Sequence, residues 1–159
     1  MPSSWPSERR ERKMTRLERL QQEILDSNIC LDEFRLAHSV SISHMDDNGD
    51  CYIAIDRTRI TTSAEEEVRL LHEMGHCKTG SFYCWHSTHE RRGRLEARAN
   101  RWAIRKRLPI DVLRQTIKQR KPRNDYELAD ELGLTVDFVL EAIRYYTETW
   151  DFDLDVLSE

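Results

Sequence analysis

Apolar side chains recur every three or four positions in parts of the chain, which is the spacing of one face of a helix. Leu17, Leu20 and Ile24 follow this spacing and predict a helix over residues 15–26. In the second half of the chain, Pro109 and Gly133 separate segments of helical character. The helices predicted there run over residues 90–108, 110–119, 125–132 and 135–148.

The segment between residues 29 and 57 has the alternation of apolar and polar residues expected of strands. "ICLDEFRLAHSVSIS" predicts one or two short strands, and "CYIAIDR" predicts another, with Ile53 and Ile55 on one side and Tyr52 and Ala54 on the other. The intervening "DDNGD" is typical of a hairpin turn, because Asn-Gly accepts the positive φ angles of tight turns. These elements predict a mostly helical α+β domain with a small antiparallel sheet.

With 159 residues, the chain is expected to form one domain with a modest core. We predict that this domain covers residues 15–148, after a disordered N-terminus over residues 1–14 and before an acidic tail over residues 149–159. Charge is unevenly distributed: residues 91–123 carry thirteen Lys or Arg against two acids, and residues 124–159 carry eleven acids against Arg144. Two interpretations stay open, namely solvated helix faces or a basic surface for an acidic partner.

The stretch "TTSAEEEVRLLHEMGHCKTG" carries the candidate chemistry. A helix is expected here because Ser63 and Glu66 form a capping-box pattern and Gly80 suits a helix end. Residues four apart on a helix differ by about 40° in direction and about 6 Å in height, so His72 and His76 can reach one metal ion. Glu73, about 100° further round, can instead hold a water molecule at that ion and take its proton.

A catalytic zinc ion usually has three protein ligands, so a third ligand is expected downstream. The candidates are Cys77, Cys84, His86, His89, Glu90 and Glu96. Glu96 is preferred, because Ala99 and Ala103 on the same predicted helix allow a second helix to approach closely. Asn100, one turn beyond Glu96, is placed to hydrogen-bond a ligand imidazole. A third histidine from the loop remains an alternative.

The motifs "HEMGH" and "EARAN" are similar to those of the glutamate-type zincins. More specifically, the chain resembles the ImmA/IrrE family of metallo-endopeptidases, in the form carried by phages and mobile elements. The resemblance covers nearly all of residues 15–148. The matching pieces are "TTSAEEEVRLLHEMGHCKTGSFY", "EARANRWAIRKRLP" and "YELADELGLTVDFVLEAI".

The resemblance implies a zincin-like fold and a zinc-dependent endopeptidase that cleaves a helix-turn-helix repressor, relieving repression of phage or mobile-element genes. By motif position, it makes His72, His76 and Glu96 the metal ligands and Glu73 the general base. Asn100 stands where the family often has aspartate, and a neutral amide makes its partner imidazole less basic. Two histidines and one carboxylate also suit several other divalent ions. The group that stabilises the oxyanion is left open among the candidates Tyr83, His86 and His89.

The segment "YELADELGLTVDFVLEAIRYY" is similar to a helix-turn-helix, with Gly133 at the turn and Thr135 as the next cap. Asp137 and Glu141 lie near the start of its second helix, where phosphates would have to bind, so direct nucleic-acid binding is not expected. Packing on the core or gripping the substrate is the preferred role. Two alternative functions remain: a non-catalytic, zinc-containing DNA-associated regulator, and a toxin-like partner protein.

Cysteine usage bears on the location of the protein. Cys30, Cys51, Cys77 and Cys84 form no CxxC pair, which predicts reduced thiols in a cytoplasmic protein. Cys77 is interpreted as a small packed residue. The first residues, "MPSSWPSERRERKM", lack the apolar stretch of a secretory signal, and no run of about 18 apolar residues predicts a membrane span.

Overall fold

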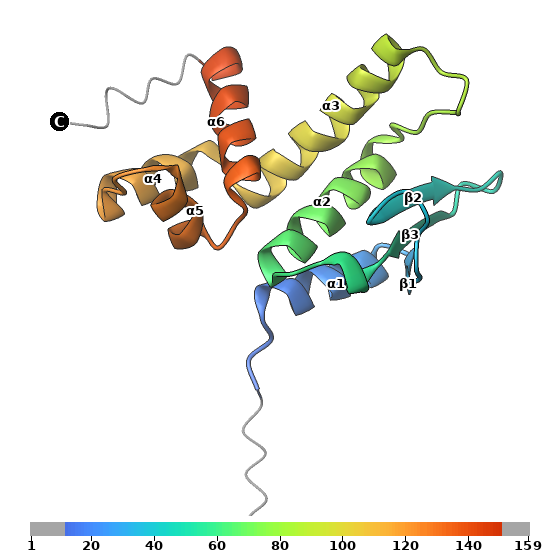
Figure 1. The fold of residues 1–159 in the computed structure, drawn as a ribbon, viewed down its shortest axis with the longest axis horizontal. Coiled ribbons are helices and arrows are strands. Elements are labelled where there is room, and N and C mark those ends of the chain that lie inside the picture. The colour runs from blue at the N-terminus through green and yellow to red at the C-terminus, as the bar shows by residue number, and fades with distance from the viewer. Residues whose placement is uncertain (1–11, 151–159) are drawn as a thin grey trace, which may run out of the picture.

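The computed structural model describes residues 12–150 and has an α+β fold, as predicted (Figure 1). Its helices are α1 (Arg16–Asp26), α2 (Ser63–Thr79), α3 (His89–Arg107), α4 (Ile110–Arg120), α5 (Asp125–Leu132) and α6 (Val136–Trp150). Its strands are β1 (Ile29–Glu33), β2 (Ser41–Met45) and β3 (Cys51–Ile55), and a short 3-10 helix spans Arg57–Arg59. The predicted N-terminal disorder and acidic tail fall largely on residues 1–11 and 151–159, outside the described residues.

The three strands form a mixed sheet in the order β1–β3–β2. β2 and β3 pair antiparallel across the predicted hairpin turn, with Met45 opposite Cys51. β1 pairs with β3 in parallel, with Ile29 opposite Cys51, so the prediction of an antiparallel sheet is wrong for this pair. Alternation of apolar and polar residues identifies a strand but not its neighbour, and here β3 inserts between two strands that are consecutive in sequence.

Helix α2 begins and ends close to the predicted residues. Its N-cap is Thr62, whose side chain accepts a hydrogen bond from Glu65 N, so the predicted capping box at Ser63 and Glu66 is wrong by one residue. Glu66 instead pairs with Arg57 at 2.8 Å. At the other end, Gly80 adopts a left-handed conformation with φ of 63°, as expected of a residue that terminates a helix.

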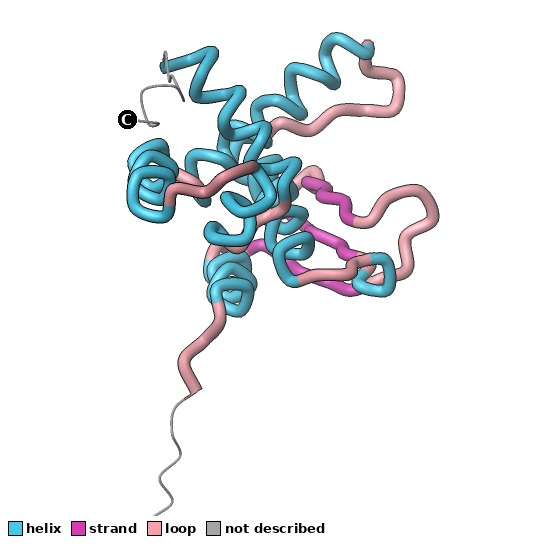
Figure 2. The backbone as a smooth tube through the Cα atoms, turned by 60° about the vertical axis from the view of Figure 1, so that its left-hand side comes forward, coloured by secondary structure: helices cyan, strands magenta, loops and turns pink. Residues whose placement is uncertain are grey.

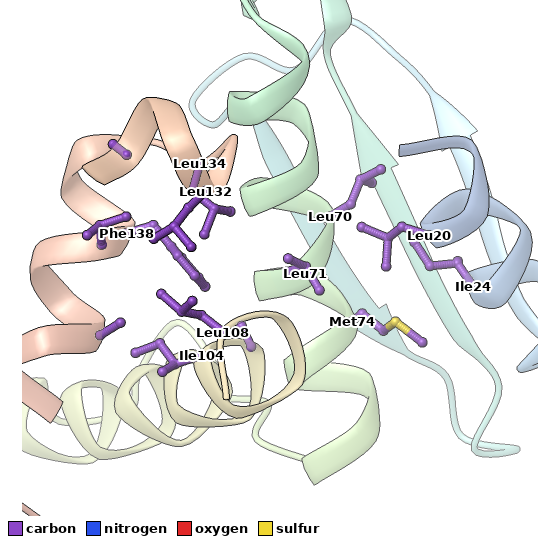
Figure 3. Close-up of a cluster of buried hydrophobic side chains, with 14 of the residues drawn as sticks. Leu20, Ile24, Leu70, Leu71, Met74, Ile104, Leu108, Leu132, Leu134 and Phe138 are labelled. Carbon is purple, nitrogen blue, oxygen red and sulfur yellow. The ribbon is translucent and has the colours of Figure 1, made fainter. Parts of the chain in front are cut away.

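Helix α2 is buried on two of its faces (Figure 3). Leu70 and Met74 point toward α1 and the sheet, and Leu71 points toward α3 and the C-terminal helices. All three side chains are at most 2% exposed. Burying each such side chain contributes about 1.5–3 kcal/mol, so packing on both sides holds α2 in one orientation. A third face of the helix remains to present the polar residues of the motif.

The approach of α2 and α3 is unusually close at Gly75. A Cβ atom built on Gly75 would lie 2.5 Å from the carbonyl oxygen of Ala99, closer than real Cβ atoms come to a neighbour. The two helices run in opposite directions and are joined by residues 80–88, which extend away from the body (Figures 1 and 2). Near their other ends, the buried Glu67 of α2 accepts a 2.5 Å hydrogen bond from Arg107 of α3.

The predicted C-terminal helical pair is present as α5 and α6. Gly133 separates the two helices with φ of 64°, and Thr135 accepts a hydrogen bond from Phe138 N at the start of the second. Tyr146 of α6 donates a 2.8 Å hydrogen bond to Leu108 O, at the end of α3. The pair therefore packs on α3, the helix that follows the HEMGH segment. None of the helices within residues 12–150 combines the length and apolar composition needed to cross a membrane.

Two of the cysteines are bonded to each other. Cys51, at the start of β3, and Cys77, near the end of α2, form a disulfide with their Cα atoms 6.0 Å apart. The prediction of reduced thiols is therefore wrong for this pair, and Cys77 is more than a packed residue. Cys30 and Cys84 are free and exposed. The pair lies 26 positions apart in sequence and is joined because the sheet packs against α2, which no local motif reveals.

Candidate metal centre

Three side chains from two helices converge at the centre of this site. His72 and His76 lie one turn apart on α2, and their Nε2 atoms are 3.1 Å apart. Glu96 of α3 places its Oε2 atom 3.0 Å from His72 Nε2 and its Oε1 atom 3.3 Å from His76 Nε2. Among residues 12–150, these three form a group that could hold a metal ion. Glu96 is the residue that was preferred as the third ligand because Ala99 and Ala103 lie near it on the same predicted helix.

The geometry and chemistry of these atoms fit a divalent cation. In a tetrahedral zinc site with bonds of about 2.0–2.1 Å, ligand atoms lie about 3.3 Å from one another, close to the separations observed. The Nδ1 atom of His72 lies 2.5 Å from Asn100 Oδ1, and that of His76 lies 2.7 Å from Ser81 O. Both partners are acceptors, so each Nδ1 carries a proton, and the Nε2 of a neutral imidazole then presents a lone pair. Two neutral imidazoles would then direct two lone pairs, beside a carboxylate, toward one point, an arrangement that a divalent cation or a proton on an Nε2 atom satisfies.

The pKa values of two of these groups reflect the same convergence. Hydrogen bonds from His72 and then His76 hold the pKa of Glu96 well below its usual range, in spite of burial. Burial by itself lowers the pKa of His72, but the hydrogen bond to Glu96 and the charges of Glu73 and Glu96 outweigh it, so the net shift is upward. Glu96 is therefore a carboxylate at neutral pH, as a metal ligand must be.

Glu73 is held beside this group by two serines of the sheet. Its Oε1 atom accepts a 2.7 Å hydrogen bond from Ser41 Oγ, and its Oε2 atom accepts one of 2.7 Å from Ser43 Oγ. The side chain is 6% exposed. The two serines fix the direction of the carboxylate, a role that was not predicted from the sequence. Their alternation in "SVSIS" was the available signal, because polar residues there occupy the side of the strand that packs on α2.

Of the three candidates for stabilising the oxyanion, only Tyr83 lines the groove. Tyr83 lines the groove and hydrogen-bonds Glu96, which together with burial raises the pKa of Tyr83 to about 12 and keeps its hydroxyl protonated at neutral pH. His86 packs edge-on against Trp85, with ring centroids 5.4 Å apart, and His89 begins α3. Neither His86 nor His89 lines the groove.

The remaining candidates for a third ligand lie elsewhere. Cys77 is in the disulfide, and Cys84 is free and exposed. Glu90 pairs with Arg94 at 3.6 Å, and its side chain is 81% exposed. Asn100 does contact the imidazole of His72, as predicted.

His72, His76 and Glu96 lie in an open groove of about 1030 Å³. One part of the wall is residues 38–43, which include the first three residues of β2, an edge strand of the sheet. Another part of the wall is the start of α6, with Asp137, Phe138 and Glu141. The groove is thus lined by residues of the edge strand β2 and of α6. The sequence did not predict which residues of α6 line the groove.

Comparisons with known proteins do not name a family for this chain. No family model matches it, and neither the curated proteins nor the solved structures give a significant match. The relationship to ImmA/IrrE peptidases therefore stays a prediction. It rests on the motif residues themselves.

Proposed function

We propose that this chain is a zinc-dependent endopeptidase that cleaves a helix-turn-helix repressor and so relieves repression of phage or mobile-element genes. The observation that carries the proposal is the convergence of His72, His76 and Glu96 in an open groove, with Glu73 held beside them. A structural zinc site requires neither a neighbouring general base nor a groove. This difference favours the enzyme over the non-catalytic alternatives.

The residues of the site suit peptide hydrolysis. When bound by His72, His76 and Glu96, zinc would supply Lewis acidity toward a water molecule and a peptide carbonyl. Glu73 accepts a proton from the attacking water and delivers it to the departing amine nitrogen as the C–N bond breaks. The protonated hydroxyl of Tyr83 is the donor that we assign to the carbonyl oxygen as its negative charge develops, and this step requires that the hydroxyl turn from Glu96 to the substrate.

The shape of the groove supports a polypeptide as substrate. An edge strand has backbone N–H and C=O groups without a neighbouring strand, and an extended peptide can pair with them. β2 occupies this position along the wall of the groove next to Glu73. The choice of a repressor among polypeptides comes from the family resemblance alone, and the repressor places the reaction in the cytoplasm. Reduced cysteines no longer support that location, given the Cys51–Cys77 bond.

The proposal assigns no direct nucleic-acid contact to the C-terminal helices. In a helix-turn-helix, the N-terminal residues of the second helix read the bases. Here the corresponding residues Asp137, Phe138 and Glu141 line the groove, and two of them are acidic. We therefore assign the start of α6 to the peptidase site.

The decisive experiment compares the zinc-loaded native chain with Glu73→Gln, using the repressor encoded beside its gene as the substrate. Glutamine keeps the size of the side chain and removes its basicity, and the three ligands remain. We expect native zinc content, with cleavage slower by roughly 10²–10⁴-fold, the usual contribution of general acid–base catalysis. Glu90→Gln, on an exposed residue outside the groove, is the matched control and should cleave at the native rate.

Two results would contradict the proposal in different ways. Cleavage by Glu73→Gln at the native rate would show that Glu73 is not the base. A native chain that binds zinc but leaves the repressor intact would favour the non-catalytic regulator. The cleavage products, identified by mass spectrometry, would give the scissile bond.

A further inference from the structure

The amide of Asn100 connects the candidate metal centre to the C-terminal helical pair. Its Oδ1 atom lies 2.5 Å from His72 Nδ1, and its Nδ2 atom donates a 2.9 Å hydrogen bond to Glu141 Oε1. The contacts run from α2 through α3 to α6, and Glu141 lies 41 positions after Asn100 in the chain. Both ends of the amide are therefore engaged in a single line of hydrogen bonds.

We propose that Glu141 is a positioning residue for the metal centre, acting on His72 through Asn100. The inference rests on the metal site of the proposed function but not on its peptidase activity. Through Glu141, α6 would take part in metal binding. Glu141 orients and polarises the Asn100 amide, which makes His72 a stronger and better-directed ligand for a divalent cation.

The need for such a residue follows from the chemistry of asparagine. An amide has a donor end and an acceptor end of nearly equal size, so Asn100 alone could turn either end toward His72. Turning the NH₂ group inward would set a donor against the Nδ1–H group. An ionised carboxylate only accepts hydrogen bonds, so Glu141 draws the NH₂ group toward itself and leaves Oδ1 facing His72. The hydrogen bond to a charged acceptor also polarises the amide and strengthens its carbonyl as an acceptor.

This arrangement compensates for the absence of an acidic residue at position 100. A carboxylate that accepts directly from a ligand histidine makes the imidazole a better donor to the metal. In this chain the amide stands at that position and the carboxylate stands one hydrogen bond further away, on α6. The charge is supplied from a distant part of the sequence.

Asp137 provides a matched control on the same helix. It lies one turn before Glu141, lines the same groove and carries the same charge, but Asn100 donates to Glu141. A general electrostatic attraction between the acidic groove and a cation would depend on both residues. Positioning through Asn100 depends on Glu141 only.

The test is the zinc affinity of the full chain, measured by competition with a chromophoric chelator. Removing residues that hold a ligand histidine typically weakens metal binding by about 10–100-fold. We expect a loss in this range for Glu141→Ala and a smaller loss for Glu141→Gln, which keeps an acceptor but not the charge. Asp137→Asn should change the affinity much less than either. Cobalt(II) spectra should shift in the Glu141 variants and stay native in Asp137→Asn, and thermal melts without metal verify that each variant is folded.

A second comparison uses Asn100→Asp, which places a carboxylate directly against His72. In that background, Glu141 faces a like charge, so Glu141→Gln should preserve or strengthen zinc binding, whereas it weakens binding beside the native Asn100. This reversal of sign distinguishes a specific line of hydrogen bonds from long-range attraction, which predicts weakening in both backgrounds.

The outcomes separate the two proposals. If Glu141→Ala and Asp137→Asn weaken zinc binding equally, or if Glu141→Gln has the same effect in both backgrounds, Glu141 does not act through Asn100 and the inference fails alone. If the native chain does not bind zinc, the metal centre of the proposed function fails as well. If the native chain binds zinc but does not cleave the repressor, the proposed peptidase activity fails and the inference about Glu141 is unaffected.

Discussion

Gly75→Ala tests whether the close contact between α2 and α3 builds the candidate metal centre. A Cβ atom at position 75 would lie 2.5 Å from Ala99 O and 3.1 Å from both Ala99 C and Ala99 Cα. All three atoms are backbone, so no side chain can rotate away. The two helices must separate, and Glu96, one turn before Ala99 on α3, must move with its helix away from the histidines of α2.

The size of the effect follows from the geometry. Reaching the 3.4 Å of an ordinary contact requires a separation of roughly 0.9 Å, whereas metal–ligand distances tolerate about 0.2 Å. Overpacking of this kind costs about 1–3 kcal/mol, partly offset by a gain of up to about 1 kcal/mol in helix propensity. Metal binding should therefore suffer more than folding, since His72 and His76 stay together on α2 while Glu96 is displaced.

The assay pairs thermal unfolding with zinc competition, and Gly93→Ala serves as the control. Gly93 also lies within a helix, but a Cβ atom there would meet nothing within 4 Å. Both variants gain the same helix propensity, so the difference of about 1–3 kcal/mol between their free energies of unfolding isolates the clash. We expect Gly93→Ala to be at least as stable as the native chain with native zinc affinity, and Gly75→Ala to be weaker in both. Equal stability and zinc affinity in the two variants would refute the reasoning.

Glu96→Ala should sharply reduce the zinc content of the purified protein, as measured by metal analysis, while His89→Ala should leave it unchanged; the reverse pattern would move the site into the loop before α3. Replacing the Cys51–Cys77 pair with serines should lower the free energy of unfolding by about 3.5 kcal/mol, the chain-entropy value for a bond between residues 26 apart, as measured by urea denaturation with and without reductant. Hydrogen bonds from Thr58 and from Leu36 N lower the pKa of Asp56, so its carboxylate stabilises the fold at neutral pH, and that stabilisation is lost as the pH falls through the lowered value. Asp56→Asn should therefore lower the melting temperature at neutral pH, and its difference from the native chain should narrow on acidification below 3.8; a constant difference would contradict this account.

The sequence by itself determined the features that depend on near neighbours. Helical spacing placed His72 and His76 on one face of α2 with Glu73 turned aside, since rise and rotation per residue are constants of the helix. Asn-Gly located the hairpin turn and Gly80 the end of α2, because both depend on φ angles that few residues accept. Glu96 was also preferred as the third ligand from near neighbours, namely the small residues Ala99 and Ala103 of the same helix.

Only the tertiary structure decided which distant side chains complete the site. The serines that hold Glu73 precede it by 30 and 32 positions, and Glu141 follows Asn100 by 41. The order of the strands and the Cys51–Cys77 bond likewise depend on which surfaces pack together. Local spacing describes the face that an element presents, but the partner of that face is selected by the packing of the whole core, to which residues throughout the chain contribute at once.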